Sequence, residues 1–381
     1  MKILMVSMFI NHFFNWVLQL EKSGHEVHWI DVSGANSYVK RIDFVDQTVI
    51  WKRKFEYPGR HWIKKNCSPL NIFIEKYNKR EFAEVFQQKL KEIQPDIVHS
   101  FELHSSCIPI LDIMNKNPKI KWIYSCWGND LFYYQNDQDK LIGIKAVFNR
   151  LDYMFADCKR DSFIAEKYGF KGGNLGTFPG GGGYELEYFK SQIKEFQSRN
   201  VILIKGYHHI FGRGNYVLEA LLEIKEEIKD FNIVVFGAHP KLLKFVDNPQ
   251  FQSMKNLTIK GSMARGEILE LMGQSLIYIG NSISDGMPNT LLEAIIMESF
   301  PIQSNPGGAT AEIIEHGKNG FLIENPEDIK EIALLIKQAI KDPELLRSGI
   351  AYNTAKIRPM LERYYIKDQV LKKYKLIEQN L

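Results

Sequence analysis

The sequence is poor in cysteine, with four in 381 residues, at Cys67, Cys107, Cys126 and Cys158. No two of them have the Cys-x-x-Cys spacing, which argues against a zinc site and a disulfide framework and fits a reducing cytoplasm. No apolar run approaches about 18 residues, so no membrane-spanning helix is predicted. The opening MKILMVSMF has no basic segment before its apolar run, so we interpret it as a strand and not as a signal peptide.

An excess of charge of one sign is also missing. The formal net charge is only +4, which argues against a strongly nucleic-acid-binding surface. The sequence contains no Gly-x-Gly-x-x-Gly after a strand, no Walker A motif, no Gly-x-Ser-x-Gly and no His-Glu-x-x-His. Clusters of Asp and Glu with the spacing of metal ligands are absent too. The residues therefore predict no metal site.

The length favours two domains, and the hydrophobic pattern agrees. In the first half, amphipathic helices alternate with predicted strands, which are KILMVSMF, HEVHWIDV, DIVHSFEL, KWIYSCWGND and LDYMFADC. The polar stretch EYFKSQIKEFQSRN precedes a second set of strands, which are VILIKG, FNIVVFG, LTIKG, LIYIG, FPIQSN and GFLIE. Strands that alternate with helices predict parallel sheets covered on both faces.

We therefore predict an α/β protein with two doubly wound, Rossmann-like domains that face each other across a cleft. The expected boundaries are residues 1–190 for the N-terminal domain, 191–360 for the C-terminal domain and 361–381 for a final amphipathic helix. Open α/β sheets bind ligands at the carboxyl ends of their strands. The cleft is therefore the default site for two substrates.

The stretch SDGMPNTLLEA places two carboxylates eight residues apart, Asp285 in a loop and Glu293 on the helix that follows. Pro288 suits the first helical turn, and Asn289 and Thr290 follow in that turn, where backbone N–H groups attract anions. Glu293 lies one turn after Asn289 on the same helix face. A loop carboxylate, an anion-accepting helix start and a second carboxylate suit a sugar nucleotide, with hydroxyls at each end and a diphosphate between.

This stretch resembles the E-x7-E motif of retaining glycosyltransferases of family 4, which have the two-domain GT-B fold. The segments SGHEVHWIDV, QPDIVHS, FPGGGGYELEYF and GGATAEIIEHGKNGFLIENPEDI resemble further signatures of that family. The resemblance implies that Glu293 binds the ribose hydroxyls and that Asp285 binds hydroxyls of the donor sugar. The plain alternative is that Glu293 only caps or solvates a helix face. Further donor-side residues implied by the resemblance are Gly237, Gly261, Ser262, Met263, Gly286, Met287, Pro288, Asn289, Thr290 and Leu291.

The chain departs from the family pattern around the expected diphosphate. Asp285 replaces the usual Glu and has a shorter reach. Tyr207 stands where the family has Arg, and Arg213 with Gly214 replaces the usual Lys-Gly. We expect Arg213, near a helix start, to grip phosphate bidentately. The candidates for the missing charge, which are otherwise solvated loop residues, are Lys205, His208 and His209.

On the acceptor side, the loop SCWGNDLFYY places Trp127 where many relatives have His. Asp130 either orients an acceptor hydroxyl or caps the following helix. His12 follows the first strand and is a candidate to face the cleft, although a His near a helix start is more often structural. The glycine run PGGGG, with Gly181 and Gly182, either lets the backbone approach a ligand closely or only bends freely.

Residues 49–65, VIWKRKFEYPGRHWIKK, combine six Lys and Arg residues with four aromatic residues and a single Glu. Such a mixture docks on an anionic membrane surface, close to a lipid-linked acceptor. It also describes a loop whose aromatic side chains pack inward while the charges stay in water.

The resemblance thus implies a retaining, metal-independent glycosyltransferase that uses no cofactor. Basic side chains and a helix start would stabilise the leaving diphosphate, whose phosphate helps to deprotonate the acceptor. A UDP-sugar donor, a glycan or glycolipid acceptor, a role in cell-surface polysaccharide synthesis and a place in the cytoplasm or on the inner face of the cell membrane follow from the family. The final helix should cross back onto the N-terminal domain. Two alternatives stay open: a sugar-nucleotide epimerase on the same fold, and a non-catalytic binder of sugar nucleotides or glycans.

Overall fold

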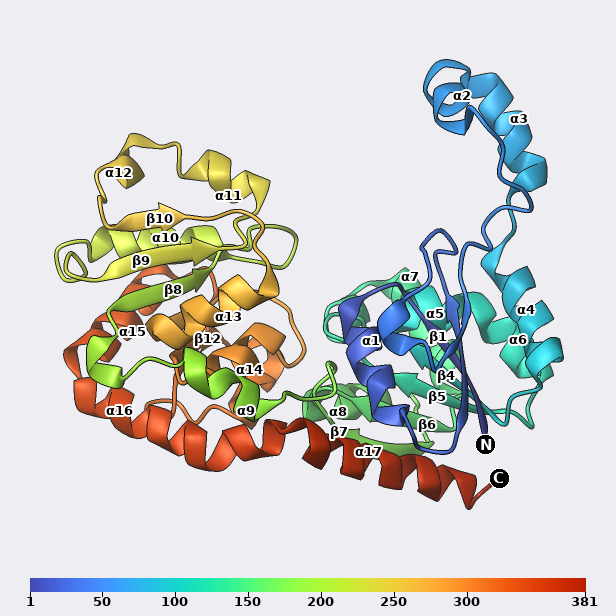
Figure 1. Ribbon diagram of the computed structural model, residues 1–381. Helices are drawn as coiled ribbons and strands as arrows, with labels where there is room; N and C mark the ends of the chain where they lie inside the picture. The colour runs from blue at the N-terminus through green and yellow to red at the C-terminus, as the bar shows by residue number, and fades with distance from the viewer. The chain divides into compact units, whose positions relative to one another are not determined.

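The computed structural model describes residues 1–381, which divide into two α/β units, each built on one parallel sheet (Figure 1). The N-terminal unit comprises residues 1–156, 162–182 and 369–381, and the C-terminal unit comprises residues 157–161 and 183–368. Two Rossmann-like units with parallel sheets confirm the predicted fold class.

The N-terminal sheet has seven strands in the order β3-β2-β1-β4-β5-β6-β7. The strands are β1 (Lys2–Ser7), β2 (Glu26–Asp31), β3 (Asp46–Thr48), β4 (Ile97–Phe101), β5 (Lys121–Ser125), β6 (Tyr153–Ala156) and β7 (Gly173–Thr177). The helices are α1 (Asn11–Val17), α2 (Arg60–Asn66), α3 (Ser68–Asn78), α4 (Phe82–Ile93), α5 (Leu103–Ser106), α6 (Leu111–Lys116), α7 (Gln138–Phe148) and α8 (Lys159–Lys167). Every residue of β4 is buried, as expected for a central strand of a parallel sheet covered on both faces.

The C-terminal sheet has six strands in the order β10-β9-β8-β11-β12-β13. The strands are β8 (Val201–Lys205), β9 (Asn232–Phe236), β10 (Leu257–Ile259), β11 (Ser275–Gly280), β12 (Phe300–Ser304) and β13 (Phe321–Ile323). The helices are α9 (Leu186–Phe189), α10 (Gly214–Glu223), α11 (Pro240–Phe245), α12 (Pro249–Gln252), α13 (Arg265–Gln274), α14 (Asn289–Ile296), α15 (Ile329–Lys341) and α16 (Pro343–Tyr352).

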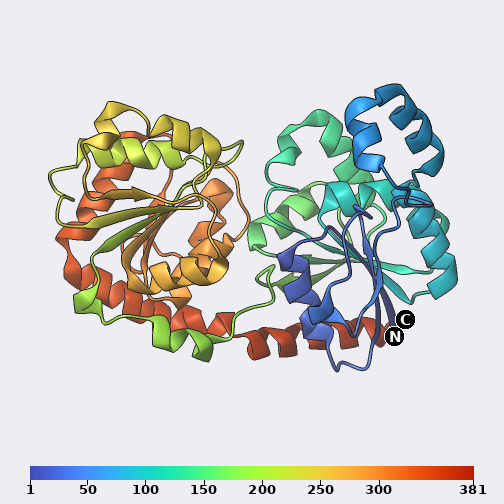
Figure 2. The same cartoon turned by 45° about the horizontal axis from the view of Figure 1, so that its top comes forward.

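The two faces of the C-terminal sheet carry separate cores because successive strand residues point to opposite sides. Ile277 and Ile279 of β11 pack with α10, α15 and α16, whereas Tyr278 packs with α13 and α14. Figure 2 shows helices on both sides of this sheet. The alternation places Tyr278 directly beneath α14, the helix that carries Glu293.

The last helix, α17 (Arg363–Glu378), begins in the C-terminal unit, and its final part belongs to the N-terminal unit. There the hydroxyl of Tyr374 lies 2.6 Å from Nδ1 of His99, and His99 Nε2 lies 2.8 Å from the hydroxyl of Ser125. Both His99 and Tyr374 are fully buried. Burial lowers the pKa of His99 to about 3, so its ring is neutral at neutral pH. None of the helices combines the length and the apolar character needed to cross a membrane.

Candidate functional site

The loops that follow β8, β9, β10 and β11 are tied to one another at the carboxyl edge of the C-terminal sheet. The ties are backbone hydrogen bonds from His239 to Gly206 (3.0 Å), from Gly237 to Gly261 (3.1 Å), from Ile283 to Phe211 (2.9 Å) and from Arg213 to Asn281 (2.9 Å). These loops hold most of the predicted donor-side residues. The fold therefore brings together at one sheet edge the segments that the sequence places far apart.

Two buried tyrosines, which the sequence analysis did not identify, form hydrogen bonds with the first residues of α14. The Tyr278 hydroxyl donates to Thr290 Oγ1 at 2.9 Å, and the Tyr184 hydroxyl lies 3.3 Å from the Asn289 carbonyl oxygen, which accepts from it. Pro288 precedes the helix in an extended conformation and supplies no side-chain cap. This corrects the expectation that Pro288 lies in the first turn, which begins with Asn289. Because Pro288 has no polar side chain, no side chain caps that turn, although the Pro288 carbonyl accepts from the Leu291 N–H at 3.0 Å.

Glu293 is a buried carboxylate, 8% exposed, one turn into α14. Arg265 Nε, at the start of α13, donates to its Oε1 at 2.8 Å. Burial raises the pKa of Glu293, while Arg265 and Lys205 act in the opposite direction. The guanidinium of Arg265 also lies 5.8 Å from the ring centroid of Tyr184. A surface carboxylate that only solvates a helix would not be buried in this way.

Asp285 lies beside Lys205, with 4.0 Å between the Nζ and Oδ2 atoms. Lys205, the last residue of β8, also places its ammonium 4.4 Å from the ring centroid of Tyr207. Tyr207 therefore occupies the expected Arg position with an exposed ring that supports a neighbouring cation. Of the three candidates for the missing charge, Lys205 is the one that contacts a motif carboxylate.

Arg213 directs its guanidinium mainly at its own loop. Its Nη1 lies 3.3 Å from the Ile210 carbonyl and 3.1 Å from the Gly212 carbonyl, and its Nε pairs with Glu327. Arg213 immediately precedes α10, as expected, but four protein oxygens share its donors in this structure. Its contact with phosphate stays a prediction.

His208 and His209 follow Lys205 in the same loop. Burial is the largest cause that lowers the pKa of each, and neighbouring cations and His239 add to it. Both rings are therefore neutral at neutral pH and do not supply a formal positive charge to a phosphate.

Arg160, which the sequence analysis missed, binds the backbone of the loop that carries Asp285. Arg160 Nη1 donates to the carbonyl of Asp285 at 2.9 Å and to that of Pro306 at 2.7 Å. At Gly286, a β-carbon would lie 2.3 Å from Oδ2 of Asp157. A larger residue there would displace the Asp157 carboxylate, so the segment containing Asp157 and Arg160 packs directly against the motif loop.

Asp157, Cys158 and Asp161 offer ligand atoms within 4.8 Å of one another, the arrangement that a metal ion would need. Arg160 already pairs with Asp161 at 2.8 Å. Burial raises the pKa of the Cys158 thiol well above its ordinary value, which opposes the thiolate that a metal ion requires. The cluster therefore fits an internal ion pair better than a metal site.

In the N-terminal unit, the predicted acceptor-side residues gather around Trp127. The rings of His12 and Trp127 lie edge to face with 6.1 Å between centroids. A β-carbon at Gly180 would lie 3.4 Å from the Trp127 ring. Gly182 has φ +68°, and a β-carbon there would meet the Asn15 carbonyl at 3.0 Å. The glycine run, which includes Gly181, therefore packs closely against this part of the unit.

Asp130 is 3% exposed, and both of its carboxylate oxygens accept hydrogen bonds. Oδ2 accepts from the Tyr124 hydroxyl at 2.6 Å and from the Leu103 N–H at 3.0 Å, and Oδ1 accepts from the Cys126 thiol at 3.0 Å. Asp130 thus binds the backbone of Leu103, the first residue of α5. These contacts give it a structural role.

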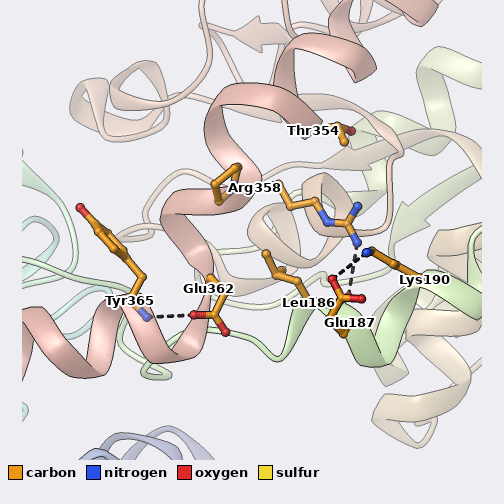
Figure 3. Close-up of a pocket in the computed structure, with 8 residues that line it drawn as sticks. Leu186, Glu187, Lys190, Thr354, Arg358, Glu362 and Tyr365 are labelled. Carbon is orange, nitrogen blue, oxygen red and sulfur yellow. Dashed lines mark hydrogen bonds and ion pairs between the residues drawn. The ribbon is translucent and has the colours of Figure 1, made fainter.

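A pocket of about 390 Å³ lies beside α9 and the start of α17, and none of the sequence-predicted residues lines it (Figure 3). The basic side chains in this pocket are already paired: Lys190 with Glu187 at 2.6 Å, and Arg358 with Glu298 at 3.2 Å. The motif residues are therefore the better candidate site.

Comparison with known proteins agrees with this geometry. Residues 181–356 match the family described as glycosyl transferases group 1, a stretch that holds every predicted donor-side residue. No curated protein sequence matches the chain.

Several solved structures share the fold of the whole chain. Sucrose-phosphate synthase from Thermosynechococcus elongatus is 13% identical over 100% of both chains, with a TM-score of 0.74. A glycosyltransferase from Rickettsia africae is 18% identical over 100% of this chain and 99% of its own, with a TM-score of 0.68. HepE of Anabaena, in complex with UDP and glucose, is 14% identical over 98% and 99%, with a TM-score of 0.70. At these identities the likeness shows the GT-B fold.

Proposed function

We propose that this chain, whose residues 181–356 match group 1 glycosyl transferases, is a retaining, metal-independent glycosyltransferase of family 4. It would move a hexose from a nucleotide-diphosphate sugar to a glycan or glycolipid acceptor. The observation that carries the proposal is Glu293, a buried carboxylate held by Arg265 one turn after an uncapped helix start. A buried charge of raised pKa is costly to keep and is typical of a binding site.

The donor would lie along the motif in the order of its chemical groups. Glu293 would accept hydrogen bonds from the ribose hydroxyls, and the first turn of α14 would receive the diphosphate. Asp285, with Lys205 beside it, would face the donor sugar. Loops after β9 and β10, around Gly237 and Gly261, would meet the base through backbone groups.

The charge that develops on the leaving diphosphate is the largest in the reaction, and the site offers two means to stabilise it. Lys205 supplies a cation within reach of the motif loop, and the N-terminus of α14 supplies aligned backbone dipoles. No side chain of the motif stands as a free nucleophile, because Asp285 is close to Lys205 and Glu293 is bound by Arg265. We therefore favour front-face transfer, in which the leaving phosphate accepts the acceptor's proton.

We favour UDP as the nucleotide. HepE of Anabaena was solved with UDP-glucose and with UDP, and the trehalose-phosphate synthase of Burkholderia xenovorans, which shares the fold, is described as UDP-forming. A cell-surface polysaccharide as the product and a place on the inner face of the cell membrane are further parts of the proposal.

A non-catalytic sugar-nucleotide binder is the second candidate, favoured by Tyr207 in the expected Arg position and by the engagement of Arg213 with its own loop. Donor turnover separates the two. The protein would be incubated with UDP-glucose, UDP-galactose and UDP-N-acetylglucosamine, with and without a metal chelator, and the sugar released by slow hydrolysis followed by proton NMR. The proposal expects one donor to be cleaved, with the first-formed sugar as the α anomer and no loss on chelation.

Release of the β anomer would contradict retention, and loss of cleavage on chelation would contradict metal independence. Binding without any cleavage or transfer would favour the non-catalytic binder. Conversion of the sugar on an intact nucleotide would point to an epimerase.

A further inference from the structure

The most exposed apolar surface of the N-terminal unit is a helical projection between β3 and α4. We call residues 52–80 the α2–α3 hairpin. The chain runs outward, forms α2 and α3, and returns beside its outgoing segment (Figures 1 and 2). The base is closed by backbone hydrogen bonds of 2.9 Å from Lys54 to Asn78 and from Arg80 to Lys52. The buried Asn78 side chain also bonds both the N–H and the carbonyl of Phe55, at 3.0 and 2.8 Å. The base of the hairpin is therefore held by specific backbone and side-chain hydrogen bonds.

Large apolar side chains of the hairpin point into solvent. Six are at least 47% exposed: Phe55, Trp62, Leu70, Ile72, Phe73 and Tyr77. The whole chain has 18 large apolar side chains with this exposure, and this segment of 29 residues holds six of them. Neither α2 nor α3 contributes to the core of the N-terminal unit that packs around α4 and α7. This surface has no partner within the unit, which marks it as an interaction surface.

The charge of the hairpin identifies the kind of partner. It has nine Lys and Arg residues and two Glu residues, a net charge of +7, although the whole chain carries only +4. The rest of the chain is therefore net negative, at −3. Both glutamates are paired inside the hairpin, Glu56 with Arg60 at 2.7 Å and Glu75 with Arg53 at 3.2 Å. Apart from Lys79, which pairs with Glu81 at 2.9 Å, the exposed lysines thus form a largely uncompensated positive surface.

The hairpin combines an apolar side of α3 with basic residues on and around it, as suits a lipid interface. Leu70, Phe73 and Tyr77 recur at helical spacing along one side, and the Phe73 and Tyr77 rings lie 5.2 Å apart. Lys76 places its ammonium 5.8 Å from the Tyr77 ring centroid. On α2, exposed Trp62 lies beside exposed Lys65. Trp and Tyr favour the boundary between headgroups and acyl chains, where lysines reach the anionic phosphates.

We propose that the α2–α3 hairpin docks the N-terminal unit on the surface of an anionic lipid bilayer. Apolar exposure alone would fit a protein partner equally well, whereas apolar side chains among uncompensated lysines fit phosphate headgroups over acyl chains. The proposal does not rest on glycosyl transfer.

The structure changes the membrane candidate that the sequence suggested, residues 49–65. Trp51 is 7% exposed, and its indole donates to the Asp31 carbonyl at 2.7 Å, so it belongs to the core. The exposed surface instead continues through α3 to Tyr77. The alternative prediction, a loop whose aromatic side chains pack inward, is wrong for Phe55 and Trp62, because both are exposed.

The test is flotation of the full chain with vesicles of two compositions. One set contains phosphatidylcholine and phosphatidylglycerol in equal amounts, and the other contains phosphatidylcholine alone. The wild type is expected to float with the anionic vesicles, with a partition coefficient at least about tenfold above that for the neutral ones, and to be released by high salt.

Two variants separate the apolar and the charged contributions. Trp62→Ser with Phe73→Ser, and Lys64→Glu with Lys65→Glu, are each expected to lower partition at least about tenfold. The matched controls are Phe163→Ser, an exposed aromatic on α8, and Lys116→Glu with Lys119→Glu, exposed lysines before β5. Circular dichroism and the unfolding midpoint should be unchanged in every variant.

Failure of the wild type to float would overturn the proposal, as would equal losses in the controls. Concentration-dependent dimerisation that the Trp62→Ser, Phe73→Ser variant abolishes, with no vesicle binding by the wild type, would assign the surface to a second copy of the chain. Nucleotide binding, measured in the same variants, reports on the other site and is expected to stay at the wild-type level.

Discussion

Arg160 Nη1 and the carbonyl oxygen of Asp285 are joined by a hydrogen bond of 2.9 Å across 125 residues of the chain. The same nitrogen holds Pro306, so one guanidinium anchors the loop that carries the first motif carboxylate and the turn that follows β12. Arg160 meets the motif loop at the backbone carbonyl of Asp285. We therefore expect Arg160 to be a positioning residue, which acts through the backbone of Asp285.

Arg160→Lys is expected to lower kcat/KM for the donor sugar by about tenfold and to leave affinity for the free nucleotide within about twofold. Lys preserves the charge beside Asp161 but has no planar fork with which to reach the two carbonyls. Steady-state kinetics and calorimetry would measure the two quantities.

Arg150→Lys is the matched control, because Arg150 also donates to backbone carbonyls, those of Asn117 and Ile120, but in the N-terminal unit. Equal losses of kcat/KM in Arg160→Lys and Arg150→Lys would contradict a specific role of Arg160 in positioning Asp285.

Lys205→Met is expected to reduce turnover by about 100-fold or more, with little change in the unfolding midpoint, because it removes the cation beside Asp285. Arg213→Met is expected to destabilise the loop after β8, since Arg213 bonds its carbonyls.

Lys330→Met, which changes an exposed lysine on α15, is the control for both variants. A large loss of turnover in Arg213→Met, without loss of stability, would assign the phosphate cation to Arg213 instead.

His99 should make the N-terminal unit sensitive to acid. Its pKa is about 3 when folded and 6.5 when exposed, so the unfolded chain binds the proton first as the pH falls. Its stabilising contribution is complete above pH 6.5 and is lost progressively below it, by up to about 1.4 kcal/mol per pH unit. His99→Gln should therefore lose about 2 kcal/mol less unfolding free energy than the wild type between pH 7 and 5. Denaturant titrations followed by tryptophan fluorescence measure this, and identical slopes would contradict it.

Glu293→Gln should not weaken the fold, although Glu293 forms an ion pair. Burial raises its folded pKa, so its contribution to stability is fully present below the unfolded pKa and is lost as the pH rises through the folded one. At neutral pH, removal of the charge should leave the unfolding free energy unchanged or raise it by up to about 1 kcal/mol. Arg265 is half exposed, so the loss of its partner costs little. A clear loss of stability would mark Glu293 as a structural ion-pair partner.

The sequence predicted the strands that are apolar and continuous, and it predicted the motif loop and helix. It missed β3 and β7, whose sequences DQT and GNLGT have almost no apolar signal and form by pairing with β2 and β6. Helical periodicity in a single chain also gives no hint that α3 turns its apolar side to solvent. That property depends on what the rest of the unit leaves uncovered.

In the site, the sequence identified residues whose role follows from local spacing, such as Glu293 after Asn289. Arg160, Arg265 and Tyr278 belong to other elements and reach the motif only through the fold. The same limit applies to Asp130, which accepts a hydrogen bond from Leu103, 27 residues earlier in the chain. Long-range side-chain contacts of this kind leave no periodic signal in the sequence.

Calorimetric titration with UDP, GDP, CDP and ADP, on the wild type and on Glu293→Gln, tests the central claim most directly. Glu270→Gln, an exposed glutamate on α13, serves as the control. We predict that one nucleotide, UDP, binds the wild type, that Glu293→Gln weakens this binding at least tenfold, about 1.4 kcal/mol, and that the control binds as the wild type does. No binding by any nucleotide, or equal affinity in Glu293→Gln, would contradict the assignment of Glu293 to the ribose and with it the proposed donor site.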